Sequence, residues 1–256
     1  MFSYKLILGL VLVVSASARY VVFEDPEGES YVVINQAEDE PHFEEDALPD
    51  YEHFVQLASP RVRRQTQGTL TLNSDGSSSM GIKVPIEGND KNVLSALGSF
   101  DHNAQLKPSS RSIGLALDNV NGHGLSVVKE TIPGMGERLT GAGKLNVFHN
   151  DNHDVNAKAF ITRNKFDFPD VPNFNTVGGG VDYTFKDKIG ASLGMANTPF
   201  LDRKDYSAMG NLNVFRNPTT SLDFNAGFKK FETPVFKSNW EPNFGLTFSK
   251  TFPNRW

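Results

Sequence analysis

The 256-residue sequence contains no cysteine, so no disulfide bond stabilises the chain. After its first 20 residues it has no apolar run of the about 20 residues that a membrane-spanning helix needs. It has no usable N-glycosylation site, because proline occupies the middle of Asn217-Pro218-Thr219. The folded part must therefore be held together by side-chain packing and hydrogen bonds alone.

The first 18 residues have the pattern of a secretory signal peptide. Lys5 precedes an apolar run at positions 6–14, and small residues follow up to Ala18. A short apolar run between a positive charge and small residues is typical of a signal that is removed on secretion. We therefore predict a secreted, extracellular protein with a signal peptide at 1–18.

Charge is distributed unevenly along the rest of the chain. Residues 19–64 carry 12 acidic residues against four arginines, whereas residues 65–256 carry 20 basic against 18 acidic residues. A proline-containing segment with high net charge and little periodicity is typical of disorder. The composition predicts a disordered acidic propeptide at 19–64 and a nearly neutral remainder.

Three arginines end the acidic segment. Arg61, Arg63 and Arg64 form the Arg-x-Arg-Arg pattern that furin-like convertases cleave, and acidic protease subsites pair well with arginine. The alternative is a solvated basic patch, but the signal peptide and the change in composition favour cleavage. The product would begin at Gln65, which can cyclise to pyrrolidone carboxylic acid.

Residues 65–256 are rich in glycine and phenylalanine, with 20 and 16 respectively. Apolar residues alternate with small or polar ones, as at Ile82, Val84 and Ile86, and no stretch has a convincing helical period. Alternation of period two, separated by turn signals such as Asp75-Gly76, is typical of strands. The pattern predicts an all-β antiparallel barrel or sandwich of about ten to twelve strands.

One short motif occurs twice. The Leu-Asn-Val-Phe-x-Asn sequence that begins at Leu145 returns 67 positions later at Leu212. We therefore divide the product into an N-terminal domain at 65–138 and two Gly/Phe-rich units at 139–205 and 206–256.

This organisation resembles the insect attacins, and the resemblance covers nearly the whole chain. It rests on the signal peptide, the acidic segment, the Arg61–Arg64 site, and an N-terminal domain followed by two glycine-rich units with the repeated motif. The resemblance implies a haemolymph antibacterial protein, active mainly on Gram-negative bacteria, that binds lipopolysaccharide and disturbs the outer membrane. The processed charge of only +2 is lower than that of the strongly cationic members.

Motifs for other chemistry are incomplete. Ser192 lies in a Gly-x-Ser-x-Gly sequence, but the motif needs a downstream histidine, and every histidine precedes it. His149, Asp151, His153 and Asp154 could suggest a metal site, but a hairpin turn requires the same residue types, and the second copy at positions 216–220 has no His or Asp. We expect no catalytic residues, no metal, no cofactor and no nucleic-acid binding.

Surface binding is the function that the pattern favours. Phe224 and Phe228, like Phe244 and Phe248, are spaced to share one sheet face, and cations beside apolar surface suit lipid A phosphates. The candidate lipopolysaccharide-binding residues are these four and the lysine pair Lys229 and Lys230. Solvated sheet edges are the alternative for the lysines, and an extracellular Gly/Phe-rich structural or carrier protein is the alternative function. The oligomeric state stays open.

Replacing Arg61 and Arg64 with alanine should leave secretion intact and prevent removal of residues 19–64, because both arginines would contact acidic protease subsites. Mass spectrometry of the secreted chain measures the outcome. A secreted variant that still begins at Gln65 would contradict cleavage by a furin-like convertase.

Overall fold

The computed structural model of the protein describes residues 21–24, 30–33, 65–169 and 171–252. Ala18 and the three arginines at 61, 63 and 64 lie outside these residues, so their processing stays a prediction. Within the acidic segment, strands β1 (Val21–Glu24) and β2 (Ser30–Val33) form an antiparallel pair. This hairpin was not expected from the sequence, because strands of four residues are too short to reveal a period.

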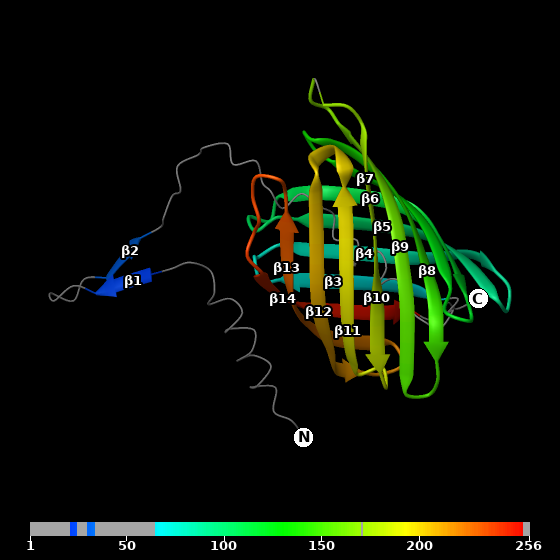
Figure 1. The fold of residues 1–256 in the computed structure, drawn as a ribbon. Coiled ribbons are helices and arrows are strands. Elements are labelled where there is room, and N and C mark those ends of the chain that lie inside the picture. Colours follow the sequence, from blue (N-terminus) through cyan, green and yellow to red (C-terminus); the bar gives the residue numbers. More distant parts are fainter. Residues whose placement is uncertain (1–20, 25–29, 34–64, 170, 253–256) are drawn as a thin grey trace. The chain divides into compact units, whose positions relative to one another are not determined.

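Residues 66–252 form a closed barrel of antiparallel strands (Figure 1). The prediction of an antiparallel all-β fold is confirmed, and the barrel is the correct one of its two alternatives. The strands in chain order are β3 (Thr66–Asn73), β4 (Ser78–Gly88), β5 (Asn92–His102), β6 (Pro108–Asn119), β7 (Gly124–Ile132), β8 (Gly136–His149), β9 (His153–Phe166), β10 (Phe174–Phe185), β11 (Ile189–Thr198), β12 (Arg203–Arg216), β13 (Thr220–Glu232) and β14 (Glu241–Phe252).

Each strand pairs with its neighbours in sequence, and β14 pairs with β3 to close the barrel. The turns therefore alternate between two ends. One end holds the turns after β4, β6, β8, β10 and β12, together with the start of β3 and the finish of β14, and we call it the asparagine end. The opposite end holds the turns after β3, β5, β7, β9, β11 and β13, including the short 3₁₀ helix η1 (Pro199–Leu201), and we call it the aromatic end.

The two faces of the sheet are reversed relative to a soluble protein. Among the described residues, the buried apolar side chains are only Val93, Leu97, Ala116, Val128 and Ala196. Most other buried side chains are polar and face the lumen. They include Ser95, Ser99, Ser110, Asp118, Arg138, Asp154, Asn156, Thr162, Asn164, Thr176, Thr198, Asn225 and Thr247. The large apolar residues of the alternating pattern consequently lie on the outer wall.

Hydrogen bonds between neighbouring strands satisfy many of these lumen groups. Asn164 Nδ2 donates to Thr176 Oγ1 at 3.1 Å, and Thr176 Oγ1 lies 2.8 Å from Thr198 Oγ1. Similar bonds join Thr140 to Thr162 and Asn225 to Thr247. Because buried polar groups cost free energy unless they are paired, this ladder lets a polar interior be stable.

Ion pairs fill further parts of the lumen. Lys83 Nζ lies 2.6 Å from Asp118 Oδ2, Lys158 pairs with Asp182, and Arg203 Nη2 lies 3.0 Å from Asp205 Oδ1. Each pair joins groups that alternation places on the inner face. Positive and negative charges in the lumen are thus matched locally.

The repeated motif encodes a repeated structure. The pairing register shifts at Val147 in β8 and at Val214 in β12, so each copy contains an irregularity near the asparagine end. Asn146 Nδ2 donates to Asp154 Oδ1 at 3.1 Å, and its counterpart Asn213 donates to Asp223 Oδ1 at 2.6 Å. The repeat therefore marks two equivalent hairpins of one barrel.

The sheet continues across the boundaries predicted at 138/139 and 205/206. The first lies inside β8 and the second inside β12, and the described residues between 65 and 252 belong to one compact unit. The glycine run at Gly178 to Gly180 is regularly paired within β10. A Cβ atom on Gly178 would lie 2.4 Å from Phe160 Cζ, so the ring of Phe160 occupies the space of the missing side chain.

Thr176→Val should destabilise the barrel by about 1–3 kcal/mol, because it leaves the buried partners of Thr176 without their hydrogen bonds. Thr176 is 1% exposed, whereas its neighbour Val177 is 41% exposed on the outer wall. Val177→Thr is the matched control and should cost less than about 1 kcal/mol. Denaturant unfolding of the secreted protein in detergent measures both, and a larger cost for Val177→Thr would contradict the assignment of faces.

Candidate functional site on the outer wall of the barrel

The outer wall carries a belt of exposed apolar side chains. Every barrel strand contributes to it, and Leu193 and Met195 of β11 are 66% and 57% exposed. Further members are Leu72, Met80, Ile82, Val84, Phe100, Ile113, Leu115, Leu125, Val127, Leu139, Leu145, Ile161, Val177, Val181, Leu212, Phe224, Phe228, Phe244 and Phe248. Contiguous exposed apolar surface of this extent marks an interaction site in a folded protein.

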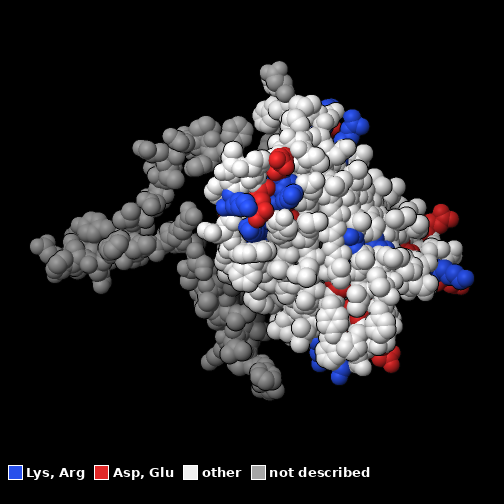
Figure 2. All heavy atoms as spheres, viewed as in Figure 1, with Lys and Arg blue, Asp and Glu red and all other residues white. Residues whose placement is uncertain are grey.

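Figure 2 shows how charged residues are distributed over one side of the molecule. Lysine, arginine, aspartate and glutamate are few on the visible wall and occur in small groups separated by broad uncharged surface. The face is therefore suited to an apolar partner more than to a uniformly charged one.

The predicted binding residues are partly brought together. Phe224, Phe228, Phe244 and Phe248 all lie on the outer wall of β13 and β14, with exposed fractions of 38–52%. Ala226 pairs with Phe244 and Leu222 pairs with Phe248, which places the four rings in one patch. These residues do not form an internal core.

The predicted lysine pair is divided between two faces. Successive residues of a strand point to opposite sides, so Lys230 shares the outer wall with Phe228 while Lys229 points to the inner face. Lys230 Nζ also lies 2.7 Å from Glu232 Oε1, which neutralises part of its charge. Lys229 and Lys230 therefore do not form a joint cationic site.

The aromatic end extends the apolar surface into the turns. Phe168, Phe166, Phe174 and Phe200 form a series of ring contacts, with centroids 6.2, 5.5 and 5.0 Å apart in that order. Phe166 and Phe174 lie on the inner face at the ends of their strands, whereas Phe168 and Phe200 are exposed in the turns. Exposed Val235, Phe236 and Trp240 occupy the connection between β13 and β14. The exposed rings in these turns lie at the margin of the apolar belt, where they suit the boundary between lipid and water.

Asparagine side chains close several turns at the asparagine end. Its turns contain Asn89, Asn119, Asn150 and Asn217, whose side-chain oxygens accept hydrogen bonds from backbone N–H groups two or three residues ahead. Such Asx contacts stabilise tight turns. The hairpin interpretation of the residues around His149 is correct.

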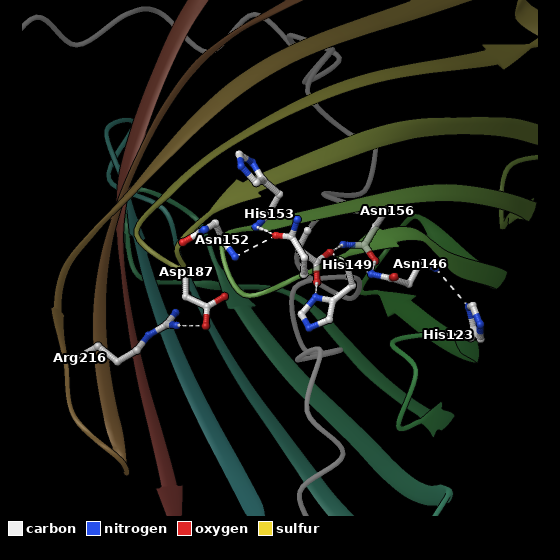
Figure 3. Close-up of polar contacts among 10 residues, drawn as sticks. His123, Asn146, His149, Asn152, His153, Asn156, Asp187 and Arg216 are labelled. Atoms are coloured by element: carbon white, nitrogen blue, oxygen red, sulfur yellow. Dashed lines mark hydrogen bonds and ion pairs between the residues drawn. The ribbon is translucent and has the colours of Figure 1, made fainter.

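The histidines at this end engage separate partners. His149 Nδ1 lies 3.0 Å from Asp154 Oδ2, and the rings of His149 and His153 lie apart in Figure 3. His153 Nδ1 lies 2.8 Å from the hydroxyl oxygen of Tyr183. Asp154 faces the lumen and His153 faces outward. Among the described residues, no three His, Asp or Glu side chains gather around a common point that would hold a metal ion.

Ser192 is a mid-strand residue of β11 that pairs with Asp182 and Met209 on the neighbouring strands. A nucleophile elbow requires a strand-to-helix turn at the serine, and this position is regular sheet. Among the residues that the structure describes, no helix has the length and apolar character needed to cross a membrane.

Two family models match the chain. The model described as attacin, N-terminal region, matches residues 66–131, and the model described as attacin, C-terminal region, matches residues 133–252. The chain belongs to the attacin family. This family assignment confirms the resemblance noted from the sequence. The two matched regions together build the one barrel, since β7 of the first pairs with β8 of the second.

Full-length relatives are close. Attacin-A of Trichoplusia ni is 79% identical over 256 residues and covers 100% of both chains. Attacin-E of Hyalophora cecropia is 54% identical over 246 residues, which are 96% of this attacin and 97% of the relative. A Lonomia obliqua relative named defense protein 3 is 53% identical over 248 residues, 97% of this chain and 99% of its own.

Two solved structures share the fold. An outer membrane channel from Pseudomonas putida F1 aligns with a TM-score of 0.51 and 9% identity, over 75% of this chain and 96% of the channel. A chain solved in work on the in-meso crystallization of membrane proteins aligns with a TM-score of 0.55 and 11% identity, over 75% and 86% of the two chains. At this identity the likeness concerns the barrel alone.

Proposed function

We propose that this attacin is a secreted antibacterial defence protein that acts on Gram-negative bacteria by binding lipopolysaccharide and disturbing the outer membrane. In this proposal a furin-like convertase first removes the acidic propeptide after Arg64, and the outer wall of the barrel then contacts lipid. Binding alone accounts for the action, without catalysis.

The observation that carries the proposal is the reversed barrel. An apolar outer wall around a polar, hydrogen-bonded lumen is the arrangement by which β-barrels contact lipid, because the closed sheet leaves no unpaired backbone edge. The strands of 8–14 residues compare with the about 9–11 residues that a tilted strand needs to cross the hydrocarbon core.

Apolar burial should supply most of the affinity. A phenylalanine that becomes fully buried gains about 1.5–3 kcal/mol, and the wall offers several half-exposed rings. An exposed ion pair gives at most about 1 kcal/mol, and residues 65–256 carry a net charge of only +2. The positive charge would thus favour anionic membranes over neutral ones, while apolar contact would supply most of the binding free energy.

The acidic segment fits a restraining role. Its 12 acidic residues against four arginines would oppose attraction to an anionic lipid surface, since net charge governs long-range steering. The segment precedes Thr66, the first residue of β3, so its removal would leave the barrel strands complete. Cleavage would then release a barrel that anionic surfaces no longer repel.

Replacing both Phe224 and Phe228 with serine should abolish permeabilisation of the outer membrane and leave the circular dichroism spectrum of the free protein unchanged. The reason is that both rings are exposed on the outer wall and contribute contact area instead of internal packing. Uptake of a hydrophobic dye by Gram-negative cells, together with their growth, measures the effect of the secreted protein.

The matched control replaces the same two residues with leucine, which keeps the apolar character and should preserve permeabilisation. Unfolding of the serine variant in the absence of bacteria would show that the two rings belong to a core, contrary to the proposal. If the unaltered secreted protein neither inhibits growth nor admits the dye, the structural or carrier function takes the place of antibacterial defence.

A further inference from the structure

Four cations gather on the outer wall where strands β6 to β9 approach the aromatic end. Arg111 lies on β6, Lys129 on β7, and Arg163 and Lys165 on β9, and we call these four residues the basic margin. The register brings them together: Lys129 pairs with Leu139, Leu139 pairs with Arg163, and Arg111 pairs with Thr131 on the same side of the sheet. They are distant in sequence and adjacent only in the folded barrel.

Alternation places all four on the outer face. Ser110, Val128, Thr162 and Asn164, which are the sequence neighbours of these cations, are buried in the lumen. The four cations themselves are exposed. Their charged groups are therefore accessible from the outside of the barrel.

One carboxylate lies within the basic margin. Glu137 of β8 pairs in register with Lys165, and its Oε1 lies 2.7 Å from Lys129 Nζ. Glu137 lies beyond the end of the apolar belt. The hydrogen bond from Lys129 and the charges of Lys129 and Lys165 lower the pKa of its carboxyl group. Within the described part of the chain, Arg111, Arg163 and Lys165 form no ion pair, so three positive charges remain in surplus.

Apolar residues begin immediately beside these cations. Ile113 follows Arg111 by two positions on the same face of β6, Val127 precedes Lys129 on β7, and Ile161 precedes Arg163 on β9. All three are more than half exposed. The boundary between cationic and apolar surface therefore runs across several adjacent strands.

We infer that the basic margin binds the phosphate groups of a phosphorylated lipid whose acyl chains lie along the neighbouring apolar wall. The inference deepens the proposed function and rests on it. Arginine donates in a fork that matches phosphate oxygens, and lysine adds a point charge. From β6 to β9 there are three inter-strand steps of about 4.8 Å, or about 14 Å, a span that admits more than one phosphate.

A second cationic group near the same end is a weaker candidate. Lys204 pairs in register with Glu232, and Lys230 and Lys237 also approach this carboxylate. Hydrogen bonding from Lys230, together with the charges of the three lysines, lowers the pKa of Glu232. This group contains no arginine that could donate two hydrogen bonds to one phosphate. It has three cations beside one carboxylate, so its surplus of positive charge is smaller than that of the basic margin.

The test uses vesicles of phosphatidylcholine that contain either lipid A with both phosphates or lipid A from which both phosphates have been removed. Three secreted proteins are compared: the unaltered chain, the triple variant R111Q/R163Q/K165Q, and the matched control K91Q/K186Q/K188Q. The control removes three exposed cations from turns at the asparagine end, so its net charge equals that of the triple variant. Circular dichroism verifies that all three are folded.

At low salt, the triple variant should bind the phosphorylated vesicles about tenfold more weakly than the unaltered chain, as expected from the loss of several exposed charge contacts. The control should lose less than about threefold, because only long-range attraction changes. On the dephosphorylated vesicles the unaltered chain and the triple variant should bind alike.

Equal losses for the triple variant and the control would overturn the basic margin as a site and leave the proposed function intact. Displacement of the unaltered chain by excess inorganic phosphate, at constant ionic strength, would also overturn it, because the site would then recognise free phosphate without the lipid. Failure of the unaltered chain to bind either vesicle would overturn the proposed function, and the inference with it.

Discussion

Closure of the sheet between β14 and β3 is the constraint on which the rest of the structure depends. Once every strand has two partners, the backbone is satisfied, and side chains decide only which face is apolar. The lumen contains hydroxyls, amides and ion pairs, many of which pair with one another. Most large apolar side chains of the alternating pattern lie on the opposite face, the outer wall.

In the proposed function, the outer wall and its margins have different roles in recognition. The belt has the area needed for affinity, but apolar contact alone does not distinguish one lipid surface from another. Cations such as Arg111 and Arg163, placed where the belt ends, supply a contact that depends on the head group. The asparagine end carries tight turns closed by Asn150 and its equivalents.

Much of the architecture follows from local patterns in the sequence. Alternation identifies the strands, and Asp75-Gly76, Asn121-Gly122 and Pro133-Gly134 lie at turns, because glycine takes the positive φ that those positions need. The repeated motif at Leu145 and Leu212 marks two hairpins whose geometry is also repeated. These features depend on neighbours in the chain, which sequence reasoning can examine.

Other features depend on pairings between distant residues. A period of two shows that Phe224 and Phe228 share a face but cannot show whether that face is inside or outside. Lys229 and Lys230 are adjacent in sequence. The alternation of a strand, which puts Phe224 and Phe228 on one face, puts these two lysines on opposite faces. The basic margin joins residues 111 to 165 through the register of four strands. The sequence does contain a local indication of it. Arg111, Lys129 and Arg163 each stand at one end of a run of alternating apolar residues.

The central claim is that the outer wall, and not the lumen, contacts lipid. Because the chain has no cysteine, a single engineered thiol can be followed at each position of β11. The rate at which a water-soluble maleimide labels Leu193→Cys and Met195→Cys in the secreted protein should fall when vesicles containing lipid A are added. The rate for Ser192→Cys, which faces the lumen, should stay the same. Protection of Ser192→Cys together with unchanged labelling at 193 and 195 would contradict the account.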